Sequence, residues 1–215
     1  MLIVYGRRNS LNVQKVMWLV GELALEHKHV PLGGSFGGLD TPEFRALNPH
    51  GKVPVIDDGG VVVWESHSIL RYLAAQHSGG RFWSADAAQR ARSEPWLDWT
   101  QTTLQPEFLG GVFWGYYRTP EAQRDEAAIA RSLERSAQLF SLLDSTLKHS
   151  PFIAGDQLGL ADITVGTQLF RYFTLAIDRP ALPNLETYYQ RLSERPHYRQ
   201  HVMVPYDDLR GRLAF

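Results

Sequence analysis

Residues 48–55 read NPHGKVPV, and the apolar run from Val53 to Ile56 has the character of a buried β-strand. A proline at the entrance to a strand is unusual, because proline cannot donate to the hydrogen-bond ladder. With a cis peptide bond before Pro54, the backbone N–H and C=O of Val53 would face outward and could pair with an extended peptide. The alternative is an ordinary loop leading into an edge strand. The segment therefore predicts a strand, with a peptide-binding edge as a hypothesis.

The sequence on both sides of this segment indicates a small mixed sheet. Asp57–Gly60 (DDGG) is a hairpin-turn signal, and Val61–Trp64 is the returning strand. Upstream, Leu2–Tyr5 and His27–Leu32 read as two further strands. Helices are expected to begin near Ser10, Thr41 and Glu65. The resulting order, β-α-β-α-β-β-α with two parallel and two antiparallel strands, is that of a thioredoxin-like domain at residues 1–79.

The pattern changes to helices alone after Ser78–Gly80, which is the candidate linker. A long helix is expected from Ala85 to about Leu109, and others from a cap at 119–121 and from Leu160. Two shorter helices are expected at 184–194 and 196–203. The predicted fold class is therefore α/β plus all-α, with a helical bundle domain at 85–215 following the thioredoxin-like domain.

Composition excludes several kinds of function. The chain of 215 residues has a formal net charge of −1 and no basic stripe, so nucleic acid is not an expected partner. No segment resembles a membrane span of about 20 apolar residues, so no membrane is expected either. It has no cysteine, which excludes disulfides, cysteine-ligated metals and a protein thiol as nucleophile. Its eight histidines show no ligand spacing, so no metal is expected. No signal peptide is recognisable, and a cytoplasmic location is expected.

Two further segments carry groups suited to a charged ligand. Arg7–Asn12 lies where the first strand meets the first helix, and the helix terminus adds positive potential there. A Ser10 hydroxyl or an Asn amide at this position could donate a hydrogen bond to a sulfur anion, or could only cap the helix. At Glu65–Ser66, a serine at a helix N-cap could hold a carboxylate and the adjacent glutamate an ammonium group. The simpler reading is again a plain cap.

Taken together, these segments resemble the cytosolic glutathione transferases, over essentially the whole chain. NPHGKVP at 48–54 and ESHSILRYL at 65–73 are specific signals. FIAGD at 152–156, followed by LADI at 160–163, is similar to the family's helical-domain capping motif, although Gly159 stands where the family has Ser or Thr. The N-terminal segment resembles theta-like and nu-like bacterial members. The resemblance implies a glutathione co-substrate and a homodimer.

The resemblance also implies roles for individual residues. Pro54 is expected to be cis and Val53 to pair with the cysteinyl backbone of glutathione. Lys52 and His50 are expected to meet the glycyl carboxylate. The remaining expected contacts are Glu65 and Ser66 with the γ-glutamyl head, and Ser10 with the sulfur, with Asn12 as substitute or helper.

The implied activity is attack of the glutathione thiolate on small hydrophobic electrophiles, a detoxification reaction. Phe113, Trp114 and Tyr117 are the candidate electrophile-site residues, because they form an unusually aromatic segment. The alternative for each is a place in the core. Two other functions stay open: a glutathione-dependent disulfide-bond reductase, and a non-catalytic glutathione-binding or regulatory protein.

Overall fold

The computed structural model describes residues 1–213, which form two compact units. The first unit contains Met1–Ala85 and Pro196–Val204, and the second contains Asp86–Arg195 and Pro205–Leu213. The short segment Pro196–Val204 therefore packs with the sheet-containing unit, although it lies within the residues 85–215 that the sequence assigns to the helical domain. The last two residues of that range lie outside the described part of the chain.

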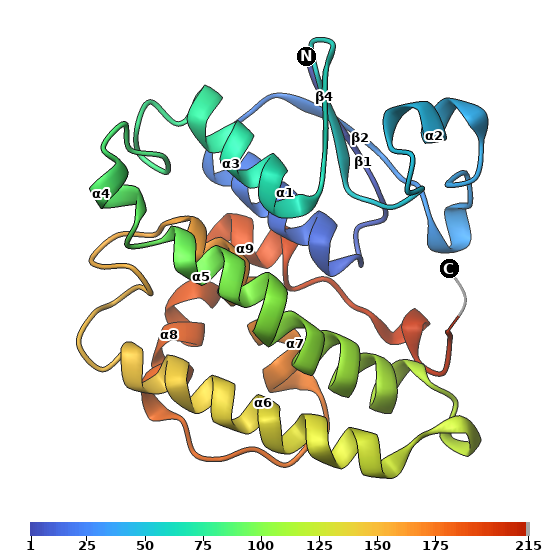
Figure 1. The fold of residues 1–215 in the computed structure, drawn as a ribbon, viewed down its shortest axis with the longest axis vertical. Coiled ribbons are helices and arrows are strands. Elements are labelled where there is room, and N and C mark those ends of the chain that lie inside the picture. Colours follow the sequence, from blue (N-terminus) through green and yellow to red (C-terminus); the bar gives the residue numbers. More distant parts are fainter. Residues whose placement is uncertain (214–215) are drawn as a thin grey trace. The chain divides into compact units, whose positions relative to one another are not determined.

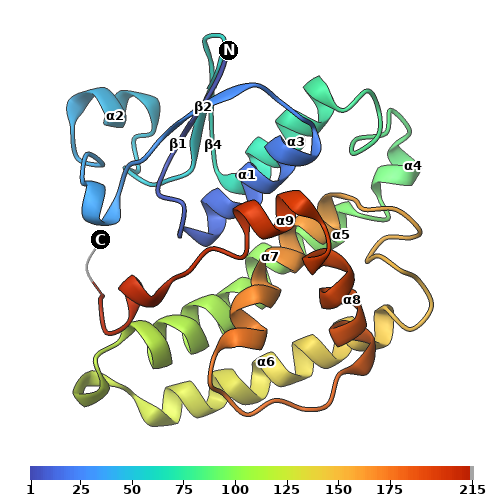
Figure 2. The same ribbon diagram turned by 180° about the vertical axis from the view of Figure 1, so that it is seen from behind.

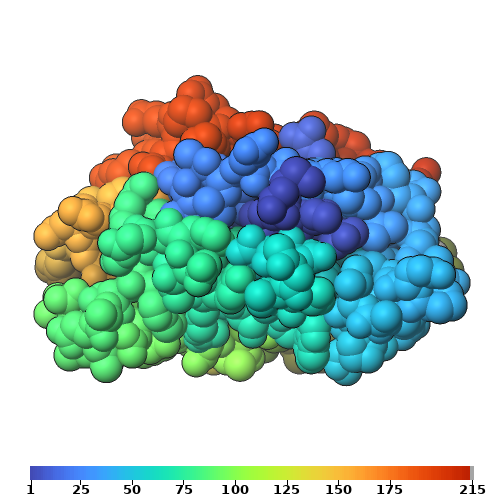
Figure 3. Space-filling model, turned by 90° about the horizontal axis from the view of Figure 1, so that it is seen from above, coloured from blue at the N-terminus to red at the C-terminus, as the bar shows by residue number. Residues whose placement is uncertain are grey.

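The first unit is built on a four-stranded mixed sheet. Its strands are β1 (Leu2–Tyr5), β2 (His27–Val30), β3 (Val55–Asp58) and β4 (Val61–Trp64). They lie in the order β2-β1-β3-β4, with β1 and β2 parallel and the other pairs antiparallel, which confirms the predicted thioredoxin-like sheet. β4 is an edge strand, and its segment is visible at the surface in Figure 3 beside the dark blue N-terminal residues.

Helices cover both faces of this sheet (Figure 1). Those of the first unit are α1 (Leu11–Glu22), α2 (Pro42–Leu47), α3 (Ser66–His77) and α9 (Pro196–His201). α1 and α3 lie on one side of the sheet and α2 on the other. α9 packs on α1, where the ring of the fully buried Trp18 meets Tyr198 edge-on at 4.8 Å. α1 is thus buried along much of its length, which matters for the site described below.

The second unit contains only helices (Figure 2). They are α4 (Ala87–Arg90), α5 (Glu94–Trp99), η2 (Thr100–Leu104), η3 (Pro106–Arg118), η4 (Glu121–Gln123), α6 (Glu126–Thr146), α7 (Leu160–Thr174), α8 (Pro183–Ser193) and η5 (Asp207–Leu209). Its core includes the rings of Phe108, Phe140 and Tyr172, with Phe140 stacked on Tyr172 at 3.7 Å.

The single helix predicted from Ala85 was wrong at its start. The chain breaks after α4 and restarts at Glu94, because Pro95 has no backbone N–H to continue the hydrogen bonding of a longer helix and suits the first turn of a new one. From Thr100 the helix continues in wide π-type turns around Pro106, which cannot donate a backbone hydrogen bond. The helix predicted from 119–121 begins later, at Glu126, where the Asp125 carboxylate accepts from the Ala128 N–H at 2.9 Å.

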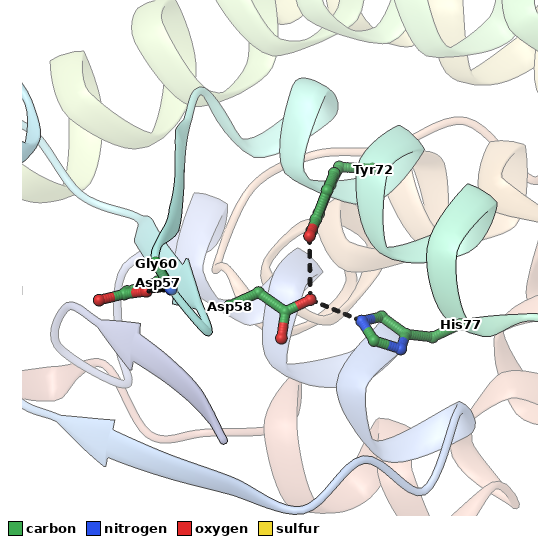
Figure 4. A network of polar contacts seen from close by, with 5 residues as sticks. All are labelled: Asp57, Asp58, Gly60, Tyr72 and His77. Carbon is green, nitrogen blue, oxygen red and sulfur yellow. Dashed lines mark hydrogen bonds and ion pairs between the residues drawn. The ribbon is translucent and has the colours of Figure 1, made fainter.

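A polar network ties β3 to α3 (Figure 4). The Asp58 carboxylate accepts a hydrogen bond from the Tyr72 hydroxyl at 3.0 Å and pairs with His77 Nε2 at 2.7 Å. Burial by itself would raise the pKa of Asp58, but the hydrogen bonds from His77 and Tyr72 hold it below its usual value. Asp57 accepts from the Gly60 N–H at 2.7 Å and closes the predicted hairpin turn. The network fixes α3 against the sheet.

Among the described residues, no helix is long and apolar enough to span a bilayer. No group of three or more His, Asp or Glu side chains in residues 1–213 could hold a metal ion.

Candidate functional site

The loop before β3 carries the first predicted contacts. The Val53–Pro54 peptide bond is cis, which confirms the prediction for Pro54. The buried Asn48 organises the loop: its Nδ2 donates to the Lys52 carbonyl at 2.8 Å, and its Oδ1 accepts from the His50 N–H at 3.0 Å. Sequence analysis gave Asn48 no role, although an asparagine that bonds the backbone two residues ahead is typical of turns.

The two residues expected to meet a carboxylate are exposed on this loop. Lys52 and His50 both lie at the surface, and the His50 ring meets Trp64 of β4 edge-on at 5.3 Å. Between them, Gly51 has φ +60°, and a Cβ there would lie 2.8 Å from the Leu39 carbonyl oxygen. The loop conformation therefore requires glycine at this position.

The second segment, at the start of α3, differs from its prediction by one residue. The N-cap is Glu65, and Ser66 is the first helical residue, nearly buried at 5% exposure. Ser66 thus keeps a backbone N–H among the first four of the helix, which have no partner within the helix. Glu65 has φ +68°, a left-handed conformation that costs a non-glycine residue about 1–3 kcal/mol. Backbone outliers of this kind concentrate at functional sites, which supports a ligand-binding role for this segment.

The third segment, before α1, leaves its serine hydroxyl available. Ser10 is the N-cap of α1 in an extended conformation, yet its side chain makes no capping hydrogen bond. The sequence left open that the Ser10 hydroxyl only caps the helix, and the structure shows that the hydroxyl makes no such bond. Its N–H instead bonds the Arg7 carbonyl at 3.1 Å and closes a tight turn.

The fold brings these three segments together at one end of the sheet. Gly6, with φ +141°, has no room for a side chain: a Cβ would lie 2.9 Å from the Cβ of Val53 and 2.5 Å from Val13. The turn that holds Ser10 therefore lies directly against the cis-proline loop. On the other side, the Ser66 hydroxyl donates to Asn12 Oδ1 at 3.5 Å. Only Gly allows the first of these approaches.

Beneath Asn12, the side chains of Lys15 and His67 form a buried pair that the sequence analysis did not predict. Lys15 has no exposed surface, and its Nζ lies 3.1 Å from Asn12 Oδ1 and 3.0 Å from His67 Nε2. Burial lowers the pKa of Lys15 to about 7, against the attraction of Glu65, which raises it. A signal was present: Lys15 is four residues from both Leu11 and Leu19, so it lies on the apolar stripe of the helix.

The candidate electrophile residues belong to the second unit, where a cavity of about 390 Å³ opens. Tyr117 lines this cavity, whereas Phe113 is buried behind it, stacked on Tyr117 at 5.3 Å. Trp114 is half-buried and covered by the Arg118 guanidinium, whose Cζ lies 4.0 Å from the ring centre. The other lining residues are Tyr116, Phe170, Thr174, Leu175, Ala176, Pro205, Tyr206, Asp207 and Arg210.

Phe170 of α7 also lines the cavity. Its neighbour Tyr206 comes from the C-terminal segment, and the Tyr206 and Thr174 hydroxyls lie 2.6 Å apart. Burial raises the pKa of both Tyr117 and Tyr206, so their hydroxyls are neutral at physiological pH. The cavity wall is therefore aromatic with neutral hydroxyl groups and a rim that carries Asp207 and Arg210.

The fold therefore defines a two-part protein, with a thioredoxin-like unit that has a cis-proline loop before β3 and a helical unit that has an aromatic cavity. Residues 4–81 match the family described as glutathione S-transferase, N-terminal domain, and residues 106–196 match the corresponding C-terminal domain. The chain belongs to the glutathione S-transferase family.

Individual relatives agree with this assignment. The chain is 39% identical to glutathione S-transferase GstB of Escherichia coli K12, covering 95% of this chain and 99% of that protein. It is similar, with a TM-score of 0.90 and 42% identity, to the glutathione-bound theta class glutathione S-transferase of Xanthomonas axonopodis pv. citri, covering 95% and 98% of the two chains. It is also 29% identical to the disulfide-bond oxidoreductase YfcG of Escherichia coli K12, over 86% of this chain and 87% of that protein.

Proposed function

We propose that this protein ionises the thiol of glutathione and directs the thiolate to a small hydrophobic electrophile. The observation that carries the proposal is the meeting of three segments: the Ser10 turn contacts Val53 through Gly6, and Asn12 is bonded to Ser66. An extended tripeptide that pairs with the Val53 backbone would have its ends and its thiol near groups of suitable chemistry.

Each part of glutathione has a counterpart in this proposal. The γ-glutamyl head binds Glu65 through its ammonium and Ser66 through its carboxylate, since a helix N-terminus attracts an anion. The glycyl carboxylate meets the exposed Lys52 and His50. Ser10, whose hydroxyl is not used in capping, donates to the sulfur, with Asn12 as helper.

The energetics do not require a protein base. A free thiol has a pKa of about 8.5, and lowering it by two units requires about 2.7 kcal/mol of preferential binding to the thiolate. One hydrogen bond to a charged acceptor contributes about 1.5–3 kcal/mol. The N-terminus of α1 adds about 0.3–1 kcal/mol. A hydroxyl donor at a helix terminus is therefore sufficient.

The electrophile site of the proposal is the aromatic cavity of the helical unit. Its volume and its lining by Tyr116, Tyr117, Phe170 and Tyr206 suit a small aromatic molecule. Of the residues named from the sequence, Tyr117 would touch the electrophile directly. Phe113 and Trp114 would act behind the wall, since Phe113 is buried and Trp114 lies under Arg118.

The decisive experiment measures the thiol pKa of bound glutathione from its ultraviolet thiolate absorbance. We expect Ser10→Ala to raise that pKa by about 1–2 units, the loss of one hydrogen bond to a charged acceptor. Ser68→Ala, on the exposed side of α3, is the matched control. Identical titrations of wild type and Ser10→Ala would remove Ser10 from the mechanism.

Turnover separates this function from its alternatives. A transferase should conjugate a chloronitrobenzene with glutathione, whereas activity on hydroxyethyl disulfide alone would identify a reductase, as the relationship to YfcG allows. Glutathione binding measured by calorimetry without turnover of either compound would indicate a binding protein. No detectable binding by folded protein would contradict all three.

A cytoplasmic homodimer completes the proposal. The edge strand β4 exposes Val61, Val62 and Trp64, with exposed fractions of 48%, 38% and 37%. An apolar edge strand left in water favours association, and a second copy would cover it. We expect light scattering to give a dimer that Val62→Lys weakens, and a monomeric mass for wild type would refute it. Cell fractionation tests the location, on which a detoxification role depends.

A further inference from the structure

Lys15 is unusual in the first unit because it is a lysine with no exposed surface. Its ammonium is fully buried in α1, whereas Lys28, Lys52 and Lys148 are exposed. Lysine is almost never fully buried unless it is paired. Its Nζ contacts Asn12 Oδ1 and His67 Nε2, and both residues lie in segments of the proposed glutathione site.

The chemistry of an ammonium group fixes how these partners are oriented. An ammonium has three N–H donors and no acceptor, so it can only receive an oxygen or a nitrogen lone pair. While Lys15 is charged, Asn12 must therefore turn its Oδ1 toward it, and a neutral His67 must carry its proton on Nδ1. The Ser66 hydroxyl donates to the same Asn12 oxygen at 3.5 Å. With the oxygen held by two donors, the NH₂ group is the end of the amide left for a ligand.

We propose that Lys15 is a positioning residue that locks the Asn12 amide with its NH₂ group toward the glutathione sulfur. The inference rests on the function proposed above and assigns Asn12 its part in it. Without Lys15 the amide can turn by half a rotation, because its two ends have nearly the same shape. Its oxygen would then face the thiolate and repel it, and the bound thiol would be a weaker acid.

Burial of this lysine supports a functional reason for keeping it. The lowered pKa of Lys15 means that burial disfavours its charge, despite the attraction of Glu65 and the contacts with Asn12 and His67. An apolar side chain of similar length would fill the same space without that cost. We therefore infer that the ammonium has a role besides stability, and its contact with Asn12 Oδ1 gives it the means to orient that amide.

The test compares Lys15→Met with Lys15→Arg and Asn12→Ala in the full-length protein. We expect Lys15→Met to raise the pKa of bound glutathione by about 1–2 units, because a donor to the thiolate is replaced by an acceptor. Lys15→Arg retains a charged donor without acceptors and should restore part of the wild-type value. In an Asn12→Ala background, Lys15→Met should cause no further shift, since no amide remains to orient.

Each outcome decides the inference. An equal shift from Lys15→Met in both backgrounds, or weaker glutathione binding without any change in thiol pKa, would overturn it, because Lys15 would then act through its charge or through the γ-glutamyl site. If Lys15→Met does not fold, Lys15→Gln gives the same reading, since its amide accepts as well as donates. Wild type that binds no glutathione refutes the proposed function itself, whereas wild type with a lowered thiol pKa and a silent Lys15→Met refutes only the role of Lys15.

Discussion

Two buried ionisable residues, one in each unit, differ in the kind of group that surrounds them. Asp162 in α7 and Lys15 in α1 both have no exposed surface. Asp162 accepts three hydrogen bonds, from the Ile153 N–H at 2.9 Å, the Gly159 N–H at 2.8 Å and the Tyr188 hydroxyl at 2.7 Å. Two of these donors are backbone groups that the fold itself must satisfy.

Lys15 instead contacts the side chains of Asn12 and His67, neither of which the backbone requires. Burial moves both charges toward neutrality: it raises the pKa of Asp162 to about 6, against its three hydrogen bonds, and lowers that of Lys15 to about 7. We infer that Asp162, which satisfies backbone donors, stabilises the helical unit, whereas Lys15, whose partners belong to the proposed glutathione site, serves that site.

The largest expected effect is on the structural member of this pair. Asp162→Ala leaves two backbone N–H groups and the Tyr188 hydroxyl without their acceptor, so we expect the free energy of unfolding to fall by about 3–5 kcal/mol. Asp162→Asn keeps one acceptor oxygen and should lose less. Urea denaturation measures both variants. A loss below about 1 kcal/mol for Asp162→Ala would contradict the structural role of Asp162.

A smaller effect is expected for Lys15, whose contribution to the free energy of unfolding depends on pH in the opposite direction to that of Asp162. Between pH 7 and its unfolded pKa near 10.5, the unfolded chain holds the Lys15 proton that the folded protein releases, so the unfolding free energy rises with pH. From pH 7 to pH 9 this contribution is about 2 kcal/mol. Wild type should gain that much over Lys15→Met across the interval, as seen by denaturation at both pH values. A constant difference between the two proteins would show that Lys15 is not held near neutrality.

For Asp162 the free energy of unfolding changes with pH in the opposite direction, and it does so at lower pH. The folded protein keeps the Asp162 proton up to about pH 6, so its contribution to the unfolding free energy falls as pH rises from about 4 to 6. His201 opposes this slope, because burial first, and then Arg8 and neighbouring histidines, lower its pKa to about 4. Asp162 is therefore isolated only by comparing wild type with Asp162→Asn.

The smallest expected effect concerns the cap beside Asp162. Gly159 is the N-cap of α7 in an extended conformation, and a Cβ there would meet only Asp162 Oδ2 at 3.8 Å. Gly159→Ser supplies the hydroxyl that glycine lacks and should stabilise the helical unit by a few tenths of a kcal/mol, about the difference between these caps. Thermal unfolding against a Gly159→Ala control, which adds the Cβ without the hydroxyl, should resolve it. A Gly159→Ser protein no more stable than Gly159→Ala would show that the hydroxyl does not cap the helix.

Much of the fold and part of the site could be predicted from local patterns. The apolar runs and the DDGG turn act over a few residues, which is why the strands and the mixed character of the sheet agree with prediction. The cis bond at Pro54 agrees with what the family resemblance implied, whereas the local pattern left it as one of two alternatives. The break before Pro95 was missed, because apolar periodicity continues across the proline that begins the new helix. The start of α6 was placed too early, because the residues at 119–121 resemble a cap whereas Asp125 is the residue that caps the helix. The cap at Glu65 differed by one residue for a similar reason, since a left-handed residue leaves no sequence signal unless it is glycine.

The sequence alone determined which chemical groups the protein has: no cysteine, a proline at the strand entrance, and Ser10, Asn12, Glu65 and Ser66 at helix starts. Only the tertiary structure decided that Lys15 lies beneath Asn12 and His67, that Asn48 holds the loop, and that Phe113 stands behind Tyr117. The physical reason is range. A turn or a cap depends on neighbours along the chain, whereas burial and the orientation of an amide depend on side chains that packing brings from far along the sequence.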